Sequence, residues 1–414
     1  MPVPFRAADA VRAARLFAIA GAAAIALASC QTRPPVPPPL APAMPAGTVP
    51  TRPLSENKPS FFNLPNIPSD RTPVRVGVLL PFDSTAPGVK ALATAMLKSA
   101  QLALYEAGNK DIILMMADEG TTPETSQAAA VKLLDQGAEI IIGPLFAPSV
   151  KAIANEARDR GVPVLAFSTD RSVAGDGIFL MSFLPENDVK RVISYAAAQG
   201  HHKFAVLSAT TPYGDVAVDS FKAAVTRAKG EVVDVERFAN SADAALKPAA
   251  DVAKSDADAV FIPVGGQVLR AISPTLGANG LDPKNVKLLG TSLWNEQGNL
   301  AEPTLSGGWF AAPSQSDDEA FVAKYKAAYG VNPPQLAALS YDAVSLVALL
   351  AKGTPYKRFT RAALSDPNGF AGVDGIFRFM PDGTAERGLA VMAVTANGFQ
   401  EVDPAPKTFV KPGS

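Results

Sequence analysis

The chain has 414 residues, 48% of them hydrophobic and 19% charged, so it can bury a sizeable core and is not globally disordered. At roughly 100–200 residues per domain, this length predicts two or three domains. The 38 Lys and Arg against 39 Asp and Glu give a net charge of −1, which disfavours a nucleic-acid partner because there is no basic field. One cysteine and two histidines leave little for a disulfide framework, a Cys/His metal site or histidine-based catalysis.

Basic and then apolar residues open the chain. Three arginines precede the apolar run 16–28, LFAIAGAAAIALA, which is typical of a secretory signal and short for a membrane span. The run ends at Leu27-Ala28-Ser29-Cys30, which resembles a bacterial lipobox. That resemblance implies lipidation of Cys30 and attachment to a membrane facing the periplasm, and Gln31 after it favours the outer membrane. An ordinary signal peptide with an incidental cysteine is the alternative.

A proline-rich segment follows. Residues 31–73 contain 13 of the chain's 37 prolines, a composition that favours extended polyproline II over a packed core. At about 3.1 Å per residue such a segment could reach roughly 130 Å. The sequence therefore predicts a signal peptide over 1–29 and a lipidated cysteine with a tether over 30–73.

From Val74 onward, short apolar runs alternate with amphipathic segments. In the first half we expect strands at 74–80, 112–117, 138–142 and 162–167, and helices at 88–107, 123–136 and 148–160. The pattern restarts at Asp188 with helices at 188–199, 215–229, 245–254 and 267–278, and strands at 204–207, 232–238, 259–264 and 286–290. A strand after Gly307, a helix ending at 329–330 and a helix at 336–350 follow. A hairpin of 375–380 and 389–394, turning at 381–383, closes the chain.

This alternation predicts the fold class. Strands that are apolar on both faces and separated by helices favour parallel sheets covered by helices, here as two similar α/β lobes. The sequence shows no short-period repeat, so a solenoid is disfavoured.

Several strings, taken in order, resemble type I periplasmic solute-binding proteins, most of all the leucine-binding subgroup. That subgroup includes lipoproteins described as penicillin-binding-protein activators. The strings are Val76–Pro81, Ile141–Phe146, Val162–Thr169, Tyr213–Asp215, Ala259–Gly266 and Ser340–Val344. The resemblance implies two Rossmann-like lobes joined by three crossovers, with a ligand cleft between them. It implies a first lobe of 74–183 plus 311–370 and a second lobe of 184–310 plus 371–414.

Ligands of open α/β sheets bind at the carboxyl ends of strands, where loops meet helix N-termini. This principle points to the loops at 83–85, 146–149, 168–170 and around Tyr213. By position, the resemblance implies that Ser149, Ser168 and Thr169 hold a ligand carboxylate and that Tyr213 makes an aromatic contact. Phe146 and Asp170 complete the predicted ligand-binding residues. For each, a purely structural role in capping a helix or a turn is the alternative.

The acid that amino-acid binders of this family place after the Gly-Gly pair is missing. Gly265-Gly266 is followed by Gln267-Val268-Leu269-Arg270, and the next acid is Asp282. A buried ammonium without a partner is strongly unfavourable, so Asp118 or Asp170 would have to replace that acid. Trp294 and Asn295 could also line the second lobe, although core packing is the commoner role for the tryptophan.

The sequence lacks a Walker A loop, a GxGxxG fingerprint and a GxSxG elbow, so we expect no catalysis, no cofactor and no metal. The first hypothesis is a module that binds a small polar, amino-acid-like solute and presents it to the membrane subunits of an ABC importer. The alternative is an envelope lipoprotein that activates a penicillin-binding protein and has a vestigial cleft. A ligand-sensing lipoprotein is a third reading.

Overall fold

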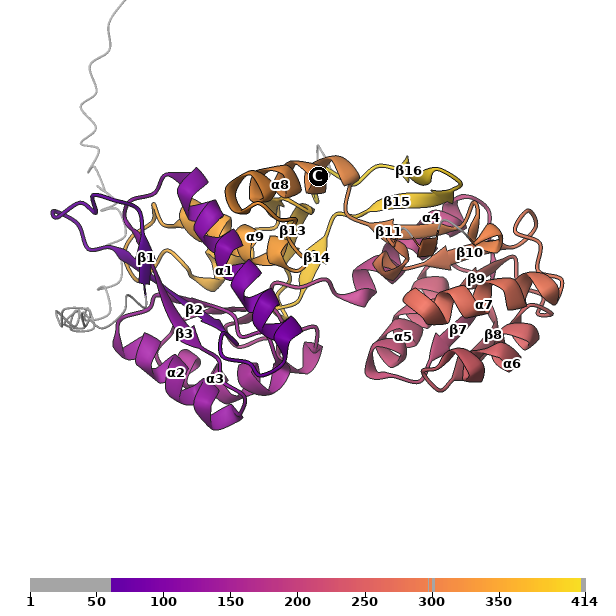
Figure 1. Cartoon of the computed structure of the whole chain (residues 1–414), viewed down its shortest axis with the longest axis horizontal. Helices are drawn as coiled ribbons and strands as arrows, with labels where there is room; N and C mark the ends of the chain where they lie inside the picture. Colours follow the sequence, from indigo (N-terminus) through magenta and orange to yellow (C-terminus); the bar gives the residue numbers. More distant parts are fainter. Residues whose placement is uncertain (1–60, 297, 300–301, 411–414) are drawn as a thin grey trace, which may run out of the picture. The chain divides into compact units, whose positions relative to one another are not determined.

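The computed structural model describes residues 61–296, 298–299 and 302–410. It confirms the α/β fold class: two separate sheets, each parallel in its centre, are covered by helices on both faces (Figure 1). Cys30 and most of the predicted tether lie outside the described residues.

The first sheet has the strand order β1-β3-β2-β4-β5-β6. All neighbours run parallel except β1, which pairs antiparallel with β3. Helices α1 and α9 cover one face and α2 and α3 the other (Figure 1). The bounds are β1 Phe61–Asn63, β2 Val74–Leu80, α1 Pro87–Ala107, β3 Ile112–Asp118, α2 Pro123–Asp135, β4 Ile140–Ile142, α3 Ala147–Asp159, β5 Val164–Ala166, β6 Ile178–Leu180 and α9 Ala337–Leu350.

The second sheet has the order β16-β15-β11-β10-β9-β7-β8, with only β15 and β16 antiparallel to their neighbours. Helices α4 and α5 pack on one face, α6 and α7 on the other. The bounds are α4 Pro185–Ala198, β7 Lys203–Ala209, α5 Pro212–Arg227, β8 Glu231–Phe238, α6 Ala242–Val252, β9 Ala259–Phe261, α7 Gly266–Ala278, β10 Lys287–Gly290, β11 Trp309–Ala312, β15 Ala390–Thr395 and β16 Gly398–Asp403.

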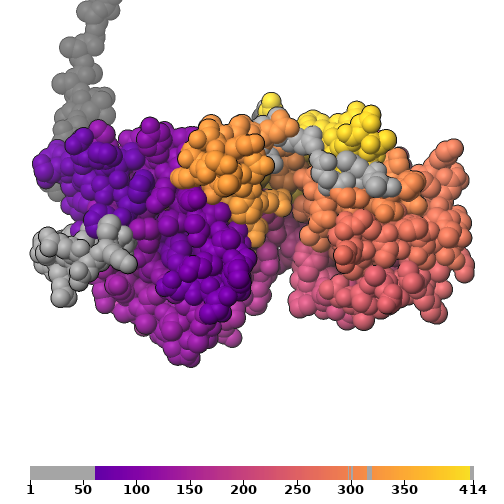
Figure 2. Space-filling view, viewed as in Figure 1, coloured from indigo at the N-terminus to yellow at the C-terminus, as the bar shows by residue number. Residues whose placement is uncertain are grey.

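A small antiparallel sheet, β12-β13-β14, belongs with the first sheet. Its strands are Phe370–Gly372, Gly375–Phe379 and Ala385–Arg387, and its aromatic residues pack into the same core as α1 and α9. Helix α8 (Gln315–Tyr329) also packs against α1, so distant segments share one body, seen in Figure 2 as orange residues against indigo ones. We call these elements the first lobe and the second sheet with α4–α7 the second lobe.

Helix ends follow local chemistry. Pro87, Pro123 and Pro212 occupy the first helical position, where a missing N–H costs nothing. The Thr122 hydroxyl accepts the backbone N–H of Thr125 and caps α2. Helix α8 ends, as predicted, at Gly330, which adopts a left-handed φ of 76°.

The three predicted passages between lobes are present: from β6 to α4, from β11 to α8 and from β14 to β15. The predicted lobe limits need correction at the C-terminal end. Residues 371–388 lie in the first lobe, because Phe377 and Phe379 enter its core, and β11 lies entirely in the second.

The predicted C-terminal hairpin is wrong in its pairing. The turn at 381–383 connects β13 to β14, while the expected second arm, β15, pairs with β11 and β16 in the other sheet. Two apolar strands that flank a Pro-Asp-Gly turn match a hairpin pattern in the sequence. In the structure, however, β13 pairs with the short strand β14 and not with β15.

Five of the described strands escaped the sequence analysis: β1, β6, β12, β14 and β16. Phe61–Asn63, assigned to the tether, pairs with the free edge of β3 because Phe61 and Phe62 pack against the two cores of the first lobe. The three-residue strand β6 was not predicted because it is too short for a periodic pattern.

Candidate functional site

The predicted site residues all follow strand ends of the two parallel sheets. Phe146 and Ser149 come after β4, Ser168, Thr169 and Asp170 after β5, and Tyr213 after β7. Because parallel strands place their carboxyl ends at one edge, these loops gather at one edge of each sheet. The candidate site therefore has two halves, one on each lobe.

In the first half, the side chain of Glu119 binds the loop between β4 and α3. The fully buried Glu119 accepts the backbone N–H groups of Leu145 at 2.8 Å and of Phe146 at 3.1 Å. Of these two residues, Phe146 lies in the loop 146–149 that was predicted to contact a ligand. A ligand cannot use the two amides while Glu119 is in place.

Ser149 takes part in the same buried network. Its hydroxyl lies 2.9 Å from that of Ser126, which also donates to the backbone oxygen of Glu119, and it hydrogen-bonds the Glu119 carboxylate. Burial raises the pKa of Glu119, and the amides of Leu145 and Phe146 with Ser149 oppose that shift. These hydrogen bonds hold the loop after β4 in place.

The other predicted residues of the first half differ in exposure. Ser168 is buried, and its hydroxyl accepts the backbone N–H of Asp170 at 3.1 Å. Asp170 is exposed, and its carboxylate accepts the N–H of Ser172 at 2.9 Å in a short turn. Thr169 is exposed and Phe146 is 42% exposed at the N-terminus of α3. Thr169, Asp170 and Phe146 are thus the predicted residues whose side chains are exposed here.

The second half is built around Tyr213 and the loop after β10. The Tyr213 hydroxyl lies 3.0 Å from the Thr291 hydroxyl, and its ring packs against the core of α4 and α5. Burial and the nearby Asp188 raise the pKa of Tyr213, so the phenol stays protonated.

A buried acid joins this group. Asp188, in the first turn of α4, accepts both the backbone N–H of Ser292 at 2.8 Å and its hydroxyl at 2.7 Å. Burial nevertheless raises the pKa of Asp188 to about 6. Tyr213, Thr291, Ser292 and Asp188 thus form one polar cluster at the carboxyl edge of the second sheet, which we call the second-lobe cluster.

The loop after Gly265-Gly266 has a structural organisation. A Cβ on Gly265 would lie 2.6 Å from the backbone oxygen of Leu293, so the two loops pack closely. Trp294 is fully buried and donates its indole N–H to Ile262 at 3.0 Å, which gives it the core role. Arg270 pairs with Glu296 at 3.6 Å.

Sequence reasoning missed Glu119, Asp188, Thr291 and Ser292 as parts of these loops. Asp118, considered in the sequence analysis as a replacement for the missing acid, accepts the N–H groups of Asp83 and Gly120 in a turn. The one available signal was the position of each residue directly after a strand or at a helix start.

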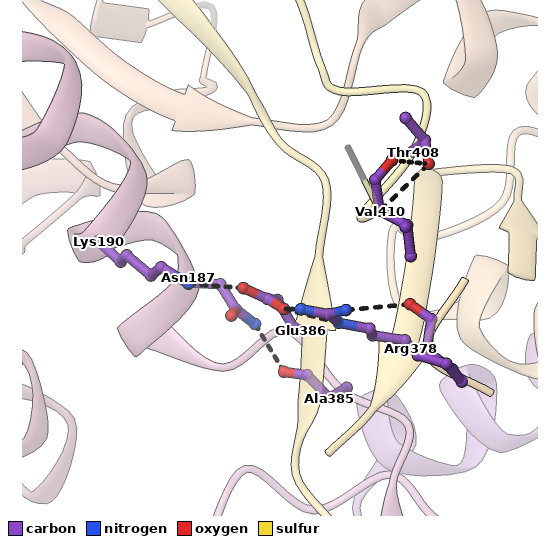
Figure 3. A network of polar contacts seen from close by, with 8 residues as sticks. Asn187, Lys190, Arg378, Ala385, Glu386, Thr408 and Val410 are labelled. Carbon is purple, nitrogen blue, oxygen red and sulfur yellow. Dashed lines mark hydrogen bonds and ion pairs between the residues drawn. The ribbon is translucent and has the colours of Figure 1, made fainter. Parts of the chain in front are cut away.

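Helix α4 contacts β14, the strand that precedes the third passage between the lobes (Figure 3). The Asn187 amide donates to the backbone oxygen of Ala385 at 2.9 Å, and Lys190 pairs with Glu386 at 2.5 Å. Glu386 also accepts two bonds from Arg378, at 2.8 and 2.6 Å. These contacts join α4 of the second lobe to β14 of the first, and we call them the hinge contacts.

Among the described residues, no group of three or more His, Cys, Asp or Glu side chains could hold a metal ion. Within the same ranges, no helix is both long and apolar enough to cross a bilayer.

The chain belongs to the periplasmic binding protein family, whose model matches residues 73–399. Its solved relatives share the same two-lobed fold. A protein assigned to branched-chain amino acid ABC transport in Rhodospirillum rubrum has a TM-score of 0.70 and 20% identity, covering 80% of this chain and 100% of that one. No match was found among curated proteins.

Two ligand-bound structures have the same fold. The substrate-binding protein LivJ of Streptococcus pneumoniae, in complex with isoleucine, has a TM-score of 0.56 and 23% identity, covering 80% of this chain and 100% of its own. A solute-binding protein of R. palustris, in complex with benzoate, has a TM-score of 0.57 and 20% identity, covering 82% and 98%. The predicted membership of the periplasmic binding protein family is confirmed.

Proposed function

We propose that this protein is a non-catalytic solute-binding protein that faces the periplasm and holds one small polar ligand between its lobes. The second-lobe cluster is the observation that carries the proposal, since buried Thr291 and Asp188 hold the partly exposed Tyr213 and Ser292 in place at the carboxyl edge of a sheet. Polar groups converging at that edge are the usual basis of recognition in open α/β folds.

The ligand contacts proposed for the first lobe are Thr169 and Phe146, with Asp170 at the rim. Ser149 and Ser168 hold the loops that present them, because their hydroxyls have protein partners. An amino-acid-like ligand is supported by the isoleucine-bound relative, and a carboxylate without an ammonium by the benzoate-bound one.

A thermal-shift screen of the refolded chain against amino acids, benzoates and cell-wall fragments tests this proposal. A ligand present at 100 times its dissociation constant stabilises the folded state by about 2.7 kcal/mol. A saturable shift with one compound class supports solute binding and identifies the ligand. Absence of any shift over all classes contradicts it.

A second function is supported by the hydrogen bonds of Glu119 and Ser149 at the start of α3. Because Glu119 binds the amides of Leu145 and Phe146, and Ser149 contacts Ser126, fewer polar groups of the first half-site are free to bind a ligand. An envelope lipoprotein that activates a penicillin-binding protein needs only the outer surface of the fold. Crosslinking in intact cells separates the two: recovery of importer membrane subunits supports solute delivery, and recovery of a peptidoglycan synthase supports activation.

Membrane attachment through a lipid on Cys30, with the outer membrane favoured, remains part of the proposal. The lipobox-like residues 27–30 and the proline-rich stretch after them support it.

A further inference from the structure

Residues 404–410, which we call the C-terminal segment, run from the second lobe to the first. The segment begins after β16, the edge strand of the second sheet, where the Asp403 carboxylate pairs with Arg191 of α4 at 2.6 Å. The same guanidinium donates to the backbone oxygen of Pro404 at 3.2 Å and to that of Leu389 at 2.7 Å. Arg191 therefore fastens the start of this segment to the third passage between the lobes.

The middle of the segment crosses that passage directly. A Cβ on Gly388 would lie 3.1 Å from both the ring carbon Cγ and the backbone oxygen of Pro406. Gly388 lies between β14 in the first lobe and β15 in the second. The absence of a side chain there lets Pro406 pack closely on the chain that joins the lobes.

The end of the segment docks an aromatic ring on the small sheet of the first lobe. A Cβ on Gly369, which has a φ of 75°, would lie 2.9 Å from two ring carbons of Phe409. The Arg378 guanidinium stacks 4.6 Å from the centre of the same ring. The Thr408 hydroxyl hydrogen-bonds both the N–H and the carbonyl of Val410 (Figure 3), which closes a backbone turn at Phe409.

Arg378 connects this docked ring to the hinge contacts. Along the edge of the same guanidinium, Nε and Nη2 donate hydrogen bonds to Glu386, which also pairs with Lys190 of α4 (Figure 3). Phe409, Arg378, Glu386 and Lys190 thus form one continuous chain of contacts from the C-terminal segment through the first lobe to the second.

We propose that residues 404–410 form a strap that crosses the hinge as a fourth connection between the lobes. The strap is held on the first lobe by non-covalent contacts alone, and it restrains how far the lobes separate. While the strap is docked, the lobes cannot move far apart without breaking the contacts of Phe409. The unliganded protein would therefore favour a narrow range of lobe separations. The inference rests on the two-lobed fold and not on the identity of any ligand.

Spin-label distances between the lobes test the strap in the ligand-free chain. Cys30→Ser removes the only native cysteine, and labels go on Gln127→Cys of α2 and Lys222→Cys of α5, both exposed. Phe409→Ala and deletion of residues 404–414 are expected to broaden the distance distribution and shift it to longer separations. Arg378→Lys, which keeps the charge but loses the planar stack, is expected to give a smaller shift in the same direction.

Lys407→Ala is the matched control, since Lys407 is an exposed side chain of the same segment. It is expected to leave the distribution unchanged. The proposal is overturned if Phe409→Ala and the deletion give the distribution of the Lys407→Ala chain, including the case in which only the melting temperature falls. Because no ligand is added, that outcome says nothing against solute binding, which the thermal-shift screen decides separately.

Discussion

The Glu119 carboxylate accepts the backbone N–H of Phe146 at 3.1 Å, which fixes the loop that opens α3. Glu119→Ala would leave the amides of Leu145 and Phe146 without their acceptor and a cavity where the buried carboxylate was. We expect it to lower the free energy of unfolding by about 2–4 kcal/mol, measured by urea unfolding. Asp159→Ala, an exposed acid at the end of α3, is the control and should change it by less than about 0.5 kcal/mol. Equal effects would show that the network does not support the loop.

Asp188 makes stability depend on pH. Burial raises its pKa from 3.8 to about 6, so between these values the folded chain binds more protons than the unfolded one. The free energy of unfolding contributed by Asp188 therefore falls as pH rises from about 4 to about 6. Asp188→Asn removes this loss. Relative to the unmodified chain, the variant should gain about 2 kcal/mol on going from pH 4 to pH 7, and a pH-independent difference would contradict the assignment.

The Tyr213 and Thr291 hydroxyls should act as a pair. Tyr213→Phe and Thr291→Val each remove their shared hydrogen bond, so each should lower the free energy of unfolding by about 0.5–1.5 kcal/mol. The double variant should cost less than the sum of the two single changes. Strict additivity in this double-mutant cycle would mean that the two hydroxyls do not interact.

A buried ion pair joins β14 to α9 in the first lobe, next to the third passage between the lobes. Arg387 of β14 and Asp342 of α9 are each 1% exposed and 3.6 Å apart, and Arg387 also contacts the rings of Phe183 and Phe377. Arg387→Met leaves a buried carboxylate unpaired and should lower the free energy of unfolding by about 3–5 kcal/mol. Adding Asp342→Asn should recover part of that loss.

The surface pair Arg160–Asp135, at 2.6 Å, provides the comparison. Arg160→Met should lower the free energy of unfolding by less than about 1 kcal/mol, because exposed ion pairs contribute little. If Arg160→Met and Arg387→Met had equal effects, the buried pair would not be a structural anchor of the hinge.

Cys30→Ser tests the lipid anchor. If a lipid on Cys30 attaches the protein, the exported variant should move from the membrane fraction to the soluble periplasmic fraction on fractionation of cells. Retention of the variant in the membrane fraction would contradict the lipobox interpretation.

The sequence predicted the central strands well because buried parallel strands and amphipathic helices carry strong periodic signals. Val74–Leu80 was predicted with its observed bounds. Partner choice was harder: strand 389–394 was recognised, but nothing local in it distinguishes pairing with β13 from pairing with β11. Such pairing depends on which core each strand enters, and that is a property of the whole fold.

Site residues were predicted by position and not by role. Placing Ser149 after β4 was sound, but its hydroxyl contacts Ser126 and Glu119, which come from another loop and another helix. Likewise, the bond between Asp188 and Ser292 joins residues 104 positions apart. Long-range partners of this kind decide whether a polar side chain is free for a ligand, and a single sequence does not contain them.

The central claim, one ligand held by both lobes, is tested most directly by titration calorimetry with the compound found in the thermal-shift screen. We predict one site per chain. Thr169→Val in the first lobe and Tyr213→Phe in the second should each weaken binding about tenfold or more, equivalent to about 1.4 kcal/mol. Leu349→Ala, an exposed residue of α9 that belongs to neither half-site, should not change it. Binding that is unaffected by both Thr169→Val and Tyr213→Phe would contradict a site between the lobes.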